Sequence, residues 1–272
     1  MKNFIVARIF SKEEYADEFI KGIVRMNPLY SYGPNEKNIT SKSDKRLDFY
    51  EGSLAYYTSG KECEIFNGFP EVLRNDIKEV WLPDDYIMRF RIYCMTCVNY
   101  ENNTPIKPDE SLRKFGNCVV IFKDFEEFYK RLKDKICSEF LVNRKPKIYL
   151  DRVRYYKRNK SKRLLPLFQK DISYSIENEL RIAVGKMSCD YEAKTERAFT
   201  DIDRSLEPYI YDIGDISDLV IKLSIDDFIN LRFPENFTLK FANTHLVINK
   251  MLETEKELFS YEPKEIRPIF TV

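Results

Sequence analysis

The sequence predicts an α+β protein in which mixed, mainly antiparallel sheets are flanked by helices. Segments that alternate and are rich in β-branched and aromatic residues outnumber segments with a helical period. Hydrophobic residues make up 43% and aromatic residues 14% of the 272 residues, which is enough to build a full core. Neither a repeat nor a Gly/Ser-rich linker interrupts the chain. We therefore expect one domain over residues 1–272, with the core motifs in residues 1–187 and an extension or lobe in residues 188–272.

Capping residues and hydrophobic periods place the individual elements. A helix is expected to begin at Ser11 and to end at Gly22, between an opening strand over residues 2–10 and a second strand from Ile23. Another helix is expected from Asp124, with apolar residues on one face, ending near residue 137. Further strands are expected at residues 47–58, 77–82, 86–98, 118–122, 147–156, 176–184, 219–223 and 237–241, exposed loops at 33–46 and 99–114, and shorter helices at 161–169, 225–231 and 250–259.

Charge and composition exclude several classes of function. The 45 basic and 44 acidic residues leave a net charge of +1, so no global field favours nucleic acid or a membrane. With His245 as its single histidine, the chain cannot build an HExxH motif or a multi-histidine metal site, and we expect no metal. The sequence has neither a GxxxxGK[ST] loop nor a GxGxxG turn, which argues against ATP-driven chemistry. It also lacks an apolar run of roughly 18 residues, so we expect no membrane partner.

The six cysteines are expected to be reduced thiols. The opening residues do not have the pattern of a signal peptide, so we expect a cytoplasmic location. Cys94 and Cys97 form a CxxC motif, but no second pair follows at zinc spacing. In a strand these two side chains point to opposite faces. We therefore interpret this motif as structural.

The most informative segment is FQKDISYSIENELRIAV, residues 168–184. Read as a strand, it places apolar residues on one face and Glu177, Glu179 and Arg181 on the other. Carboxylates two residues apart on a strand are roughly 6–7 Å apart, close enough to share a ligand and to differ in pKa. Such a pair can stabilise an oxocarbenium ion and activate a nucleophile. The alternative interpretation is a solvent-facing ladder of charges.

This segment also carries a resemblance to known families. Lys170, Tyr174, Glu177, Glu179 and Arg181 form the pattern K-x3-Y-x2-E-x-E-x-R. The pattern resembles a bacterial and phage-borne family of uncharacterised domains that occurs near mobile and defence genes. The earlier landmarks FIVARIF, EFIKGIVRMNPLYSY, RLDFYEG, IYCMT, FGNCVVIF and VRYY fit the same family over residues 1 to about 185.

The order of these landmarks is also similar to that of ADP-ribosyltransferases. In those enzymes a basic residue on the first strand holds NAD, a Ser-Thr-Ser strand braces the site, and the second Glu of a late ExE motif contacts the nicotinamide ribose. The resemblance implies that Arg8 holds the dinucleotide and that Thr96 stands in the bracing strand. It implies that Glu177 orients the acceptor and that Glu179 is catalytic, with NAD as a substrate. We expect Lys170, Tyr174 and Arg181 to assist cofactor binding.

Three classes of function remain open from the sequence. The first is an effector or toxin of a phage-defence or mobile-element system that transfers ADP-ribose from NAD to a protein or nucleic-acid acceptor. The second is a non-catalytic accessory module that binds nucleic acid or protein. The third is a structural accessory protein of a phage or mobile element whose aromatic-rich surface is an oligomer interface. The residues expected to contact nucleic acid in the second case are Arg152, Arg154, Tyr155, Tyr156 and Lys157.

The two long polar loops, residues 33–46 and 99–114, separate the enzyme from the binding module in part. An enzyme is expected to close loop residues over the carboxylates, whereas a binding module needs no such convergence. The loop and substrate residues expected to approach Glu177 are Arg46, Asp48, Glu51, Tyr56 and Tyr57. The oligomeric state and the identity of the acceptor are open.

Overall fold

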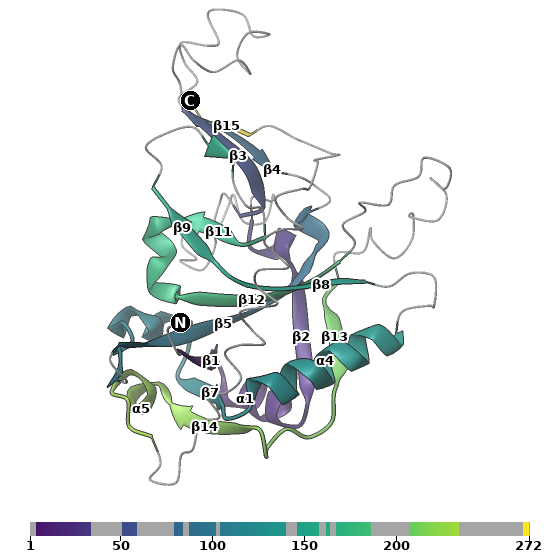
Figure 1. The fold of residues 1–272 in the computed structure, drawn as a ribbon, viewed down its shortest axis with the longest axis vertical. Coiled ribbons are helices and arrows are strands. Elements are labelled where there is room, and N and C mark those ends of the chain that lie inside the picture. Colours follow the sequence, from purple (N-terminus) through teal and green to yellow (C-terminus); the bar gives the residue numbers. More distant parts are fainter. Residues whose placement is uncertain are drawn as a thin grey trace, which may run out of the picture.

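A computed structural model of the chain describes residues 4–33, 51–58, 79–83, 87–101, 104–139, 146–157, 162–163, 167–185, 207–233 and 269–271. It confirms the predicted α+β class: a large, mainly antiparallel sheet lies against helices (Figure 1). Within these ranges no helix is both long and apolar enough to cross a bilayer.

Nine strands form the main sheet, in the order β13-β2-β5-β1-β7-β14, with β12 and β6 also paired to β5 and β8 paired to β12. All of these pairings are antiparallel. The strands are β1 (Phe4–Phe10), β2 (Ile23–Pro28), β5 (Arg91–Glu101), β6 (Thr104–Pro105), β7 (Cys118–Phe122), β8 (Lys147–Arg152), β12 (Glu179–Gly185), β13 (Tyr209–Asp212) and β14 (Val220–Ser224).

Strand β5 is the centre of this sheet. Thr96 on β5 pairs with Glu179 of β12 on one side and with Ala7 of β1 on the other. Arg91 likewise pairs with β12 and, on the side that β1 also uses, with Pro28 of β2. Strands β1 and β2 therefore share one edge of β5, and residues 93–95 lie in the gap between their pairings.

Helices α1 (Glu13–Ile20) and α4 (Phe125–Glu139) cover one face of the main sheet, which we call the helix face (Figure 1). The apolar stripe of α4 that the sequence predicted lies in the core here, together with Phe19 of α1. Two smaller cores lie on the opposite face. Around them lie α5 (Ile225–Ile229) and the 3₁₀ turns η1 (Leu29–Ser31), η3 (Ile87–Arg89) and η4 (Glu110–Phe115).

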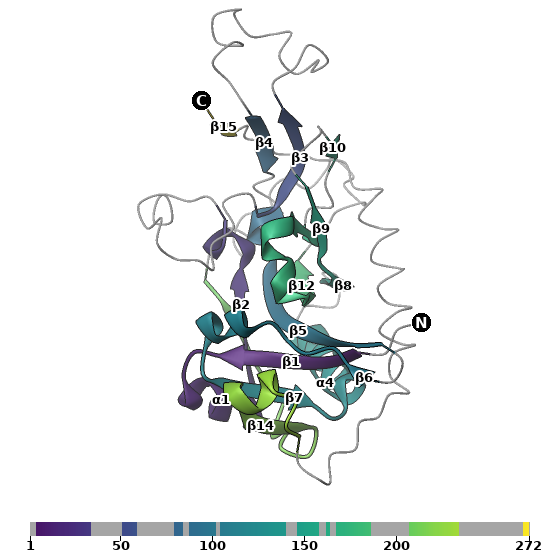
Figure 2. The same ribbon diagram turned by 90° about the vertical axis from the view of Figure 1, so that its left-hand side faces the viewer.

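A second sheet has the order β10-β3-β4-β15 and lies at the end of the molecule away from α1 and α5 (Figure 2). Its strands are β3 (Ser53–Thr58), β4 (Glu79–Pro83), β10 (Lys162–Arg163) and β15 (Ile269–Thr271). A parallel pair, β9 (Arg154–Tyr156) and β11 (Gln169–Asp171), completes the described strands.

Several predicted elements differ from those that the structure shows. The helix expected at residues 161–169 is wrong, because residues 162–163 pair with β3 and residues 169–171 pair with β9. The sequence did not predict β13 or β15. The loop expected at 99–114 contains the end of β5, β6 and η4. The elements expected at 237–241 and 250–259, His245, and all but the first residue of the 33–46 loop lie outside the described residues.

Candidate functional site

The face of β12 opposite the helices carries a buried group of charges. Alternation along the strand sends Leu180 and Ile182 into the core of the helix face, so Glu179 and Arg181 point the other way. Glu179 is 3% exposed and Arg181 0% exposed. The prediction that these residues share one face is therefore correct, but the solvent-facing ladder is wrong, because both side chains are buried.

Arg181 uses all five of its N–H donors on neighbouring oxygens. It donates to both oxygens of Glu179, at 2.8 and 3.2 Å, and to both oxygens of Glu51, at 2.8 and 3.3 Å. Its fifth hydrogen bond, of 2.6 Å, goes to the Leu167 carbonyl. These are charge-assisted, bidentate contacts that fix both carboxylates in place.

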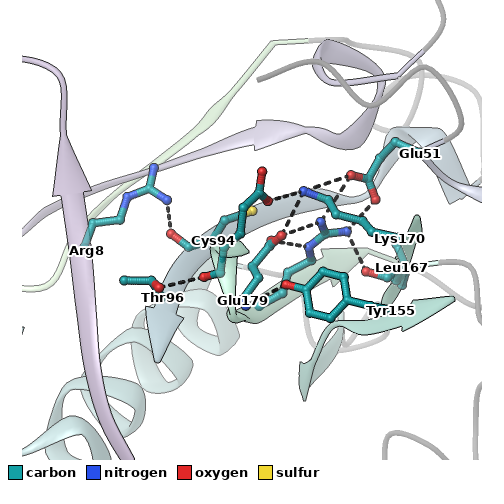
Figure 3. Close-up of polar contacts among 10 residues, drawn as sticks. Arg8, Glu51, Cys94, Thr96, Tyr155, Leu167, Lys170 and Glu179 are labelled. Carbon is teal, nitrogen blue, oxygen red and sulfur yellow. Dashed lines mark hydrogen bonds and ion pairs between the residues drawn. The ribbon is translucent and has the colours of Figure 1, made fainter. Parts of the chain in front are cut away.

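Lys170 on β11 lies among three carboxylates. Its Nζ is 2.9 Å from Glu177 Oε2, 2.9 Å from Glu179 Oε2 and 3.5 Å from Glu51 Oε2. Figure 3 shows Lys170, Glu179 and Glu51 pointing toward one another. We call Glu51, Lys170, Glu177, Glu179 and Arg181 the charge cluster. Its three carboxylates face two cations, so one negative charge is in excess when all five groups are ionised.

Glu177 reaches this cluster by a route that the sequence did not predict. The expected strand at 176–184 begins only at Glu179, because residues 172–177 form the 3₁₀ turn η5 (Ile172–Glu177). Asp171 caps this turn by accepting a hydrogen bond from the Ser173 amide. Asn178 ends it in the left-handed region, at φ 42°, a conformation that asparagine tolerates better than most residues.

Asn178 and Thr96 hold the junction between η5 and β12. The Asn178 carbonyl accepts a hydrogen bond of 2.8 Å from the Cys97 amide, and its side-chain amide donates to the Cys97 carbonyl. The Thr96 hydroxyl donates to the Glu177 carbonyl at 2.6 Å. Thr96 thus holds the backbone at the junction between the two glutamates.

The surroundings move the pKa values of the two glutamates in opposite directions. Burial raises the pKa of Glu179, but the charges of Arg181 and Lys170 outweigh it and hold that pKa well below its ordinary value. Burial and the negative charges of Glu179 and Glu51 raise the pKa of Glu177, whereas the positive charge of Lys170 lowers it. Because burial and the two negative charges together have the larger effect, the pKa of Glu177 is raised above its ordinary value. Carboxyl groups separated in this way can take different roles in proton transfer.

The two cysteines of the CxxC motif point to opposite faces, as expected. Cys97 lies in the core of the helix face, and burial raises the pKa of its thiol to about 12. Cys94 packs on the other side, next to the charge cluster, where burial and the charge of Glu179 raise its thiol pKa further. Neither thiol is primed as a nucleophile. In the described residues, no group of three or more His, Cys, Asp or Glu side chains is arranged to hold a metal.

Arg8 lies apart from the charge cluster. It pairs across the sheet with Val120, a core residue of the helix face, and its guanidinium lies 4.8 Å from the centre of the Tyr93 ring. It donates to the carbonyl of Cys94, in the gap between β1 and β2 (Figure 3). Thr96 and Glu179 therefore share one face, while Arg8 approaches β5 from its edge and the other face.

The remaining predicted residues divide between the site and other places. Tyr174 lies beside the cluster, with Lys170 Nζ 5.5 Å from the centre of its ring. Glu51, expected to approach Glu177, does join the charge cluster, where it is an ion-pair partner of Arg181 and is 1% exposed. Tyr56 and Tyr57 are placed only by their backbone pairing in β3. Arg46 and Asp48 lie outside the described residues.

The basic run expected to bind nucleic acid is partly turned inward. Tyr155 accepts a hydrogen bond of 2.9 Å from the Glu179 amide, and Tyr156 is 5% exposed. Arg152 donates to the Asn178 side chain and lies over the Phe4 ring. Arg154 keeps 41% of its side-chain surface exposed, and Lys157 is exposed.

Sequence reasoning missed the role of Asn178 as the turn between the glutamates and that of Tyr155, which accepts a hydrogen bond from the Glu179 amide. The first had a signal, since asparagine is enriched among residues in the left-handed region. Comparison of the chain with protein-family models, with curated proteins and with solved structures found no match.

Proposed function

We propose that this chain cleaves the nicotinamide N-glycosidic bond of NAD and transfers ADP-ribose to a protein or nucleic-acid acceptor. The observation that carries this proposal is the pair of glutamates around Lys170, with pKa values moved apart, at the junction of η5 and β12 beside Thr96. The resemblance noted in the sequence supplies the substrate class. It also suggests a biological setting, an effector or toxin of a phage-defence or mobile-element system.

The electrostatics of the charge cluster suit this reaction. Breaking the glycosidic bond develops positive charge on the ribose, and a fixed negative charge in a water-poor site stabilises it. The excess carboxylate supplies that charge without any reorganisation, because Arg181 and Lys170 already hold the glutamates in place. A carboxylate of raised pKa can also take the proton of the attacking group.

The contacts of Lys170 and Arg181 do not favour the role in cofactor binding that the sequence predicted for them. All five donors of Arg181 are used, and Lys170 faces three carboxylates. A phosphate there would have to displace a glutamate and leave it buried without a partner. In our proposal Lys170 and Arg181 therefore hold the glutamates in place and do not bind the phosphates of the dinucleotide.

The test is release of nicotinamide from NAD by the purified chain, together with transfer of label from adenylate-labelled NAD to protein, RNA and DNA. The double variant Glu177→Gln, Glu179→Gln is expected to lower turnover by at least about 100-fold. Glu139→Gln, on α4 at the helix face, is the matched control and is expected to match the wild type. Absence of both nicotinamide release and transfer with the wild-type chain would remove the proposal.

Salt-sensitive binding of RNA or DNA in the absence of turnover would instead favour the binding module. That alternative depends on the exposed part of the basic run, Arg154 and Lys157. Exchange of both for glutamine would then weaken binding and flatten its dependence on salt. The same exchange would leave nicotinamide release unchanged if the chain is an enzyme.

A further inference from the structure

The three carboxylates of the charge cluster are not equally engaged. Glu179 accepts from Arg181 on both oxygens and lies 2.9 Å from Lys170, and Glu51 accepts from Arg181 on both oxygens. Glu177 contacts Lys170 through Oε2 alone. Its Oε1 has no hydrogen-bond partner among the described residues.

Glu177, the carboxylate with the fewest contacts in the cluster, is also the most exposed of the three. The side chain of Glu177 is 11% exposed, compared with 4% for Glu179 and 1% for Glu51. A substrate that reached Glu179 would have to break its bidentate hydrogen bonds with Arg181 and its ion pair with Lys170. A substrate that reached Glu177 would meet an oxygen that is already open.

We infer that Glu177 is the carboxyl group that contacts the substrate and exchanges the proton, and that Glu179 is a positioning residue that never leaves its partners. This inference rests on the proposed function for the identity of the reaction. It reverses the roles that the family resemblance implies, in which the second glutamate contacts the ribose.

In this assignment the reaction balances as follows. The bond between ribose C1′ and the nicotinamide nitrogen breaks, and its electron pair neutralises the pyridinium, which leaves as nicotinamide. The acceptor atom forms the new bond to C1′ and gives its proton to the Glu177 carboxylate. Bulk water then takes that proton. With water as the acceptor, the same steps give hydrolysis of NAD.

The neighbours of Glu177 favour this role. Burial raises its pKa first, and the charges of Glu179 and Glu51 act in the same direction, so it is a stronger base than an ordinary carboxylate. Among the described residues, the charged and titratable groups that act on Glu177 include Lys170 of β11, Glu179 of β12, Glu51 ahead of β3 and Tyr155 of β9.

The inference predicts opposite shifts from two substitutions. Glu179→Gln removes a negative neighbour and is expected to lower the pKa of Glu177, whereas Lys170→Met removes a positive neighbour and is expected to raise it. Both are measured by NMR titration of a chain with carbon-13 in its glutamate carboxyl groups. Loss of one resonance in Glu177→Gln assigns the signal, and Glu139→Gln is the control that leaves it in place.

This titration needs no turnover, so it stands apart from the test of the proposed function. A Glu177 resonance with an ordinary pKa that moves in neither variant would overturn the inference even if NAD is cleaved. If Lys170→Met fails to fold, the downward shift in Glu179→Gln still decides the matter. If the pKa of Glu177 shifts in the two variants as expected but the wild type releases no nicotinamide, Glu177 remains the proton-exchanging group and NAD is rejected as its substrate.

Turnover gives a second readout when the wild type is active. Glu177→Gln is expected to lower kcat by at least about 100-fold and to abolish the acid limb of the pH profile. Glu179→Gln is expected to keep more activity, with the acid limb moved to lower pH. The reverse result, in which Glu177→Gln keeps the limb and Glu179→Gln removes it, would show that Glu179 is the catalytic residue.

Discussion

The two faces of β12 are stabilised in different ways, although their side chains alternate along one strand. Leu180 and Ile182 enter an aromatic core under α1 and α4, whereas Glu179 and Arg181 enter the charge cluster. Burial of apolar surface is favourable whatever the partner, and many contacts share its energy. A buried charge is tolerated only while its partners are present. Substitutions on the helix face should therefore lower stability in proportion to the number of atoms removed. On the charged face, the loss should depend on which charged partner is left buried and unpaired.

Removal of Arg181 is expected to have the largest effect. Arg181→Met leaves Glu51 and Glu179 buried with Lys170 as their nearest cation, and should cost about 3–5 kcal/mol in the free energy of unfolding. Urea denaturation measures this loss. Addition of Glu51→Gln to this variant should restore part of it, because one unpaired charge is removed. A double variant less stable than Arg181→Met would contradict our view of the charged face.

Replacement of Phe128 tests the helix face and should change the free energy of unfolding by a similar amount. It is 0% exposed, and its ring lies 4.7–6.1 Å from those of Phe19, Tyr93, Phe122 and Phe125. Phe128→Ala should cost about 3–5 kcal/mol by loss of contacts and formation of a cavity. Phe128→Leu should cost much less, since it keeps most of the volume. Equal losses from both variants in urea denaturation would show that shape, and not apolar volume, governs this face.

Asn178 tests the junction between the two glutamates, with a smaller effect. Both Asn178→Gly and Asn178→Ala lose the side-chain contacts to Cys97 and Arg152, but only alanine is strained at φ 42°. Alanine should therefore be less stable than glycine by about 1–2 kcal/mol. Thermal unfolding of the two variants, compared at one pH, gives this difference. Equal stabilities would mean that the left-handed turn is not needed.

The pH dependence of stability should show the smallest effect. The folded state raises the pKa of Glu177 above its ordinary value of 4.5, so the native chain binds this proton more tightly than the unfolded chain. Stability from this group is full below the unfolded pKa and is lost as pH rises through the folded pKa. Glu177→Gln lacks that loss, so its stability relative to the wild type should increase as pH rises above about 4.5. A difference that is constant with pH in urea titrations would contradict the raised pKa.

The local parts of this fold were predictable from the sequence. The strand over residues 118–122 was predicted with its observed bounds, and the long helix was predicted to within a few residues, because each carries its own hydrophobic pattern. Residues 162–163 were expected to be helical and instead pair with β3. A two-residue strand has no pattern of its own, so only its distant partner could reveal it.

For the candidate site, the sequence by itself determined which charges alternate with apolar residues in β12, and therefore that Glu179 and Arg181 share a face. The tertiary structure decided that this face is buried, that Glu51 joins it, and that η5 and Asn178 bring Glu177 to the same lysine. The physical reason is that side-chain direction follows from the local backbone period. Burial and pairing of a charge depend instead on residues more than a hundred positions away, as Glu51 is from Arg181.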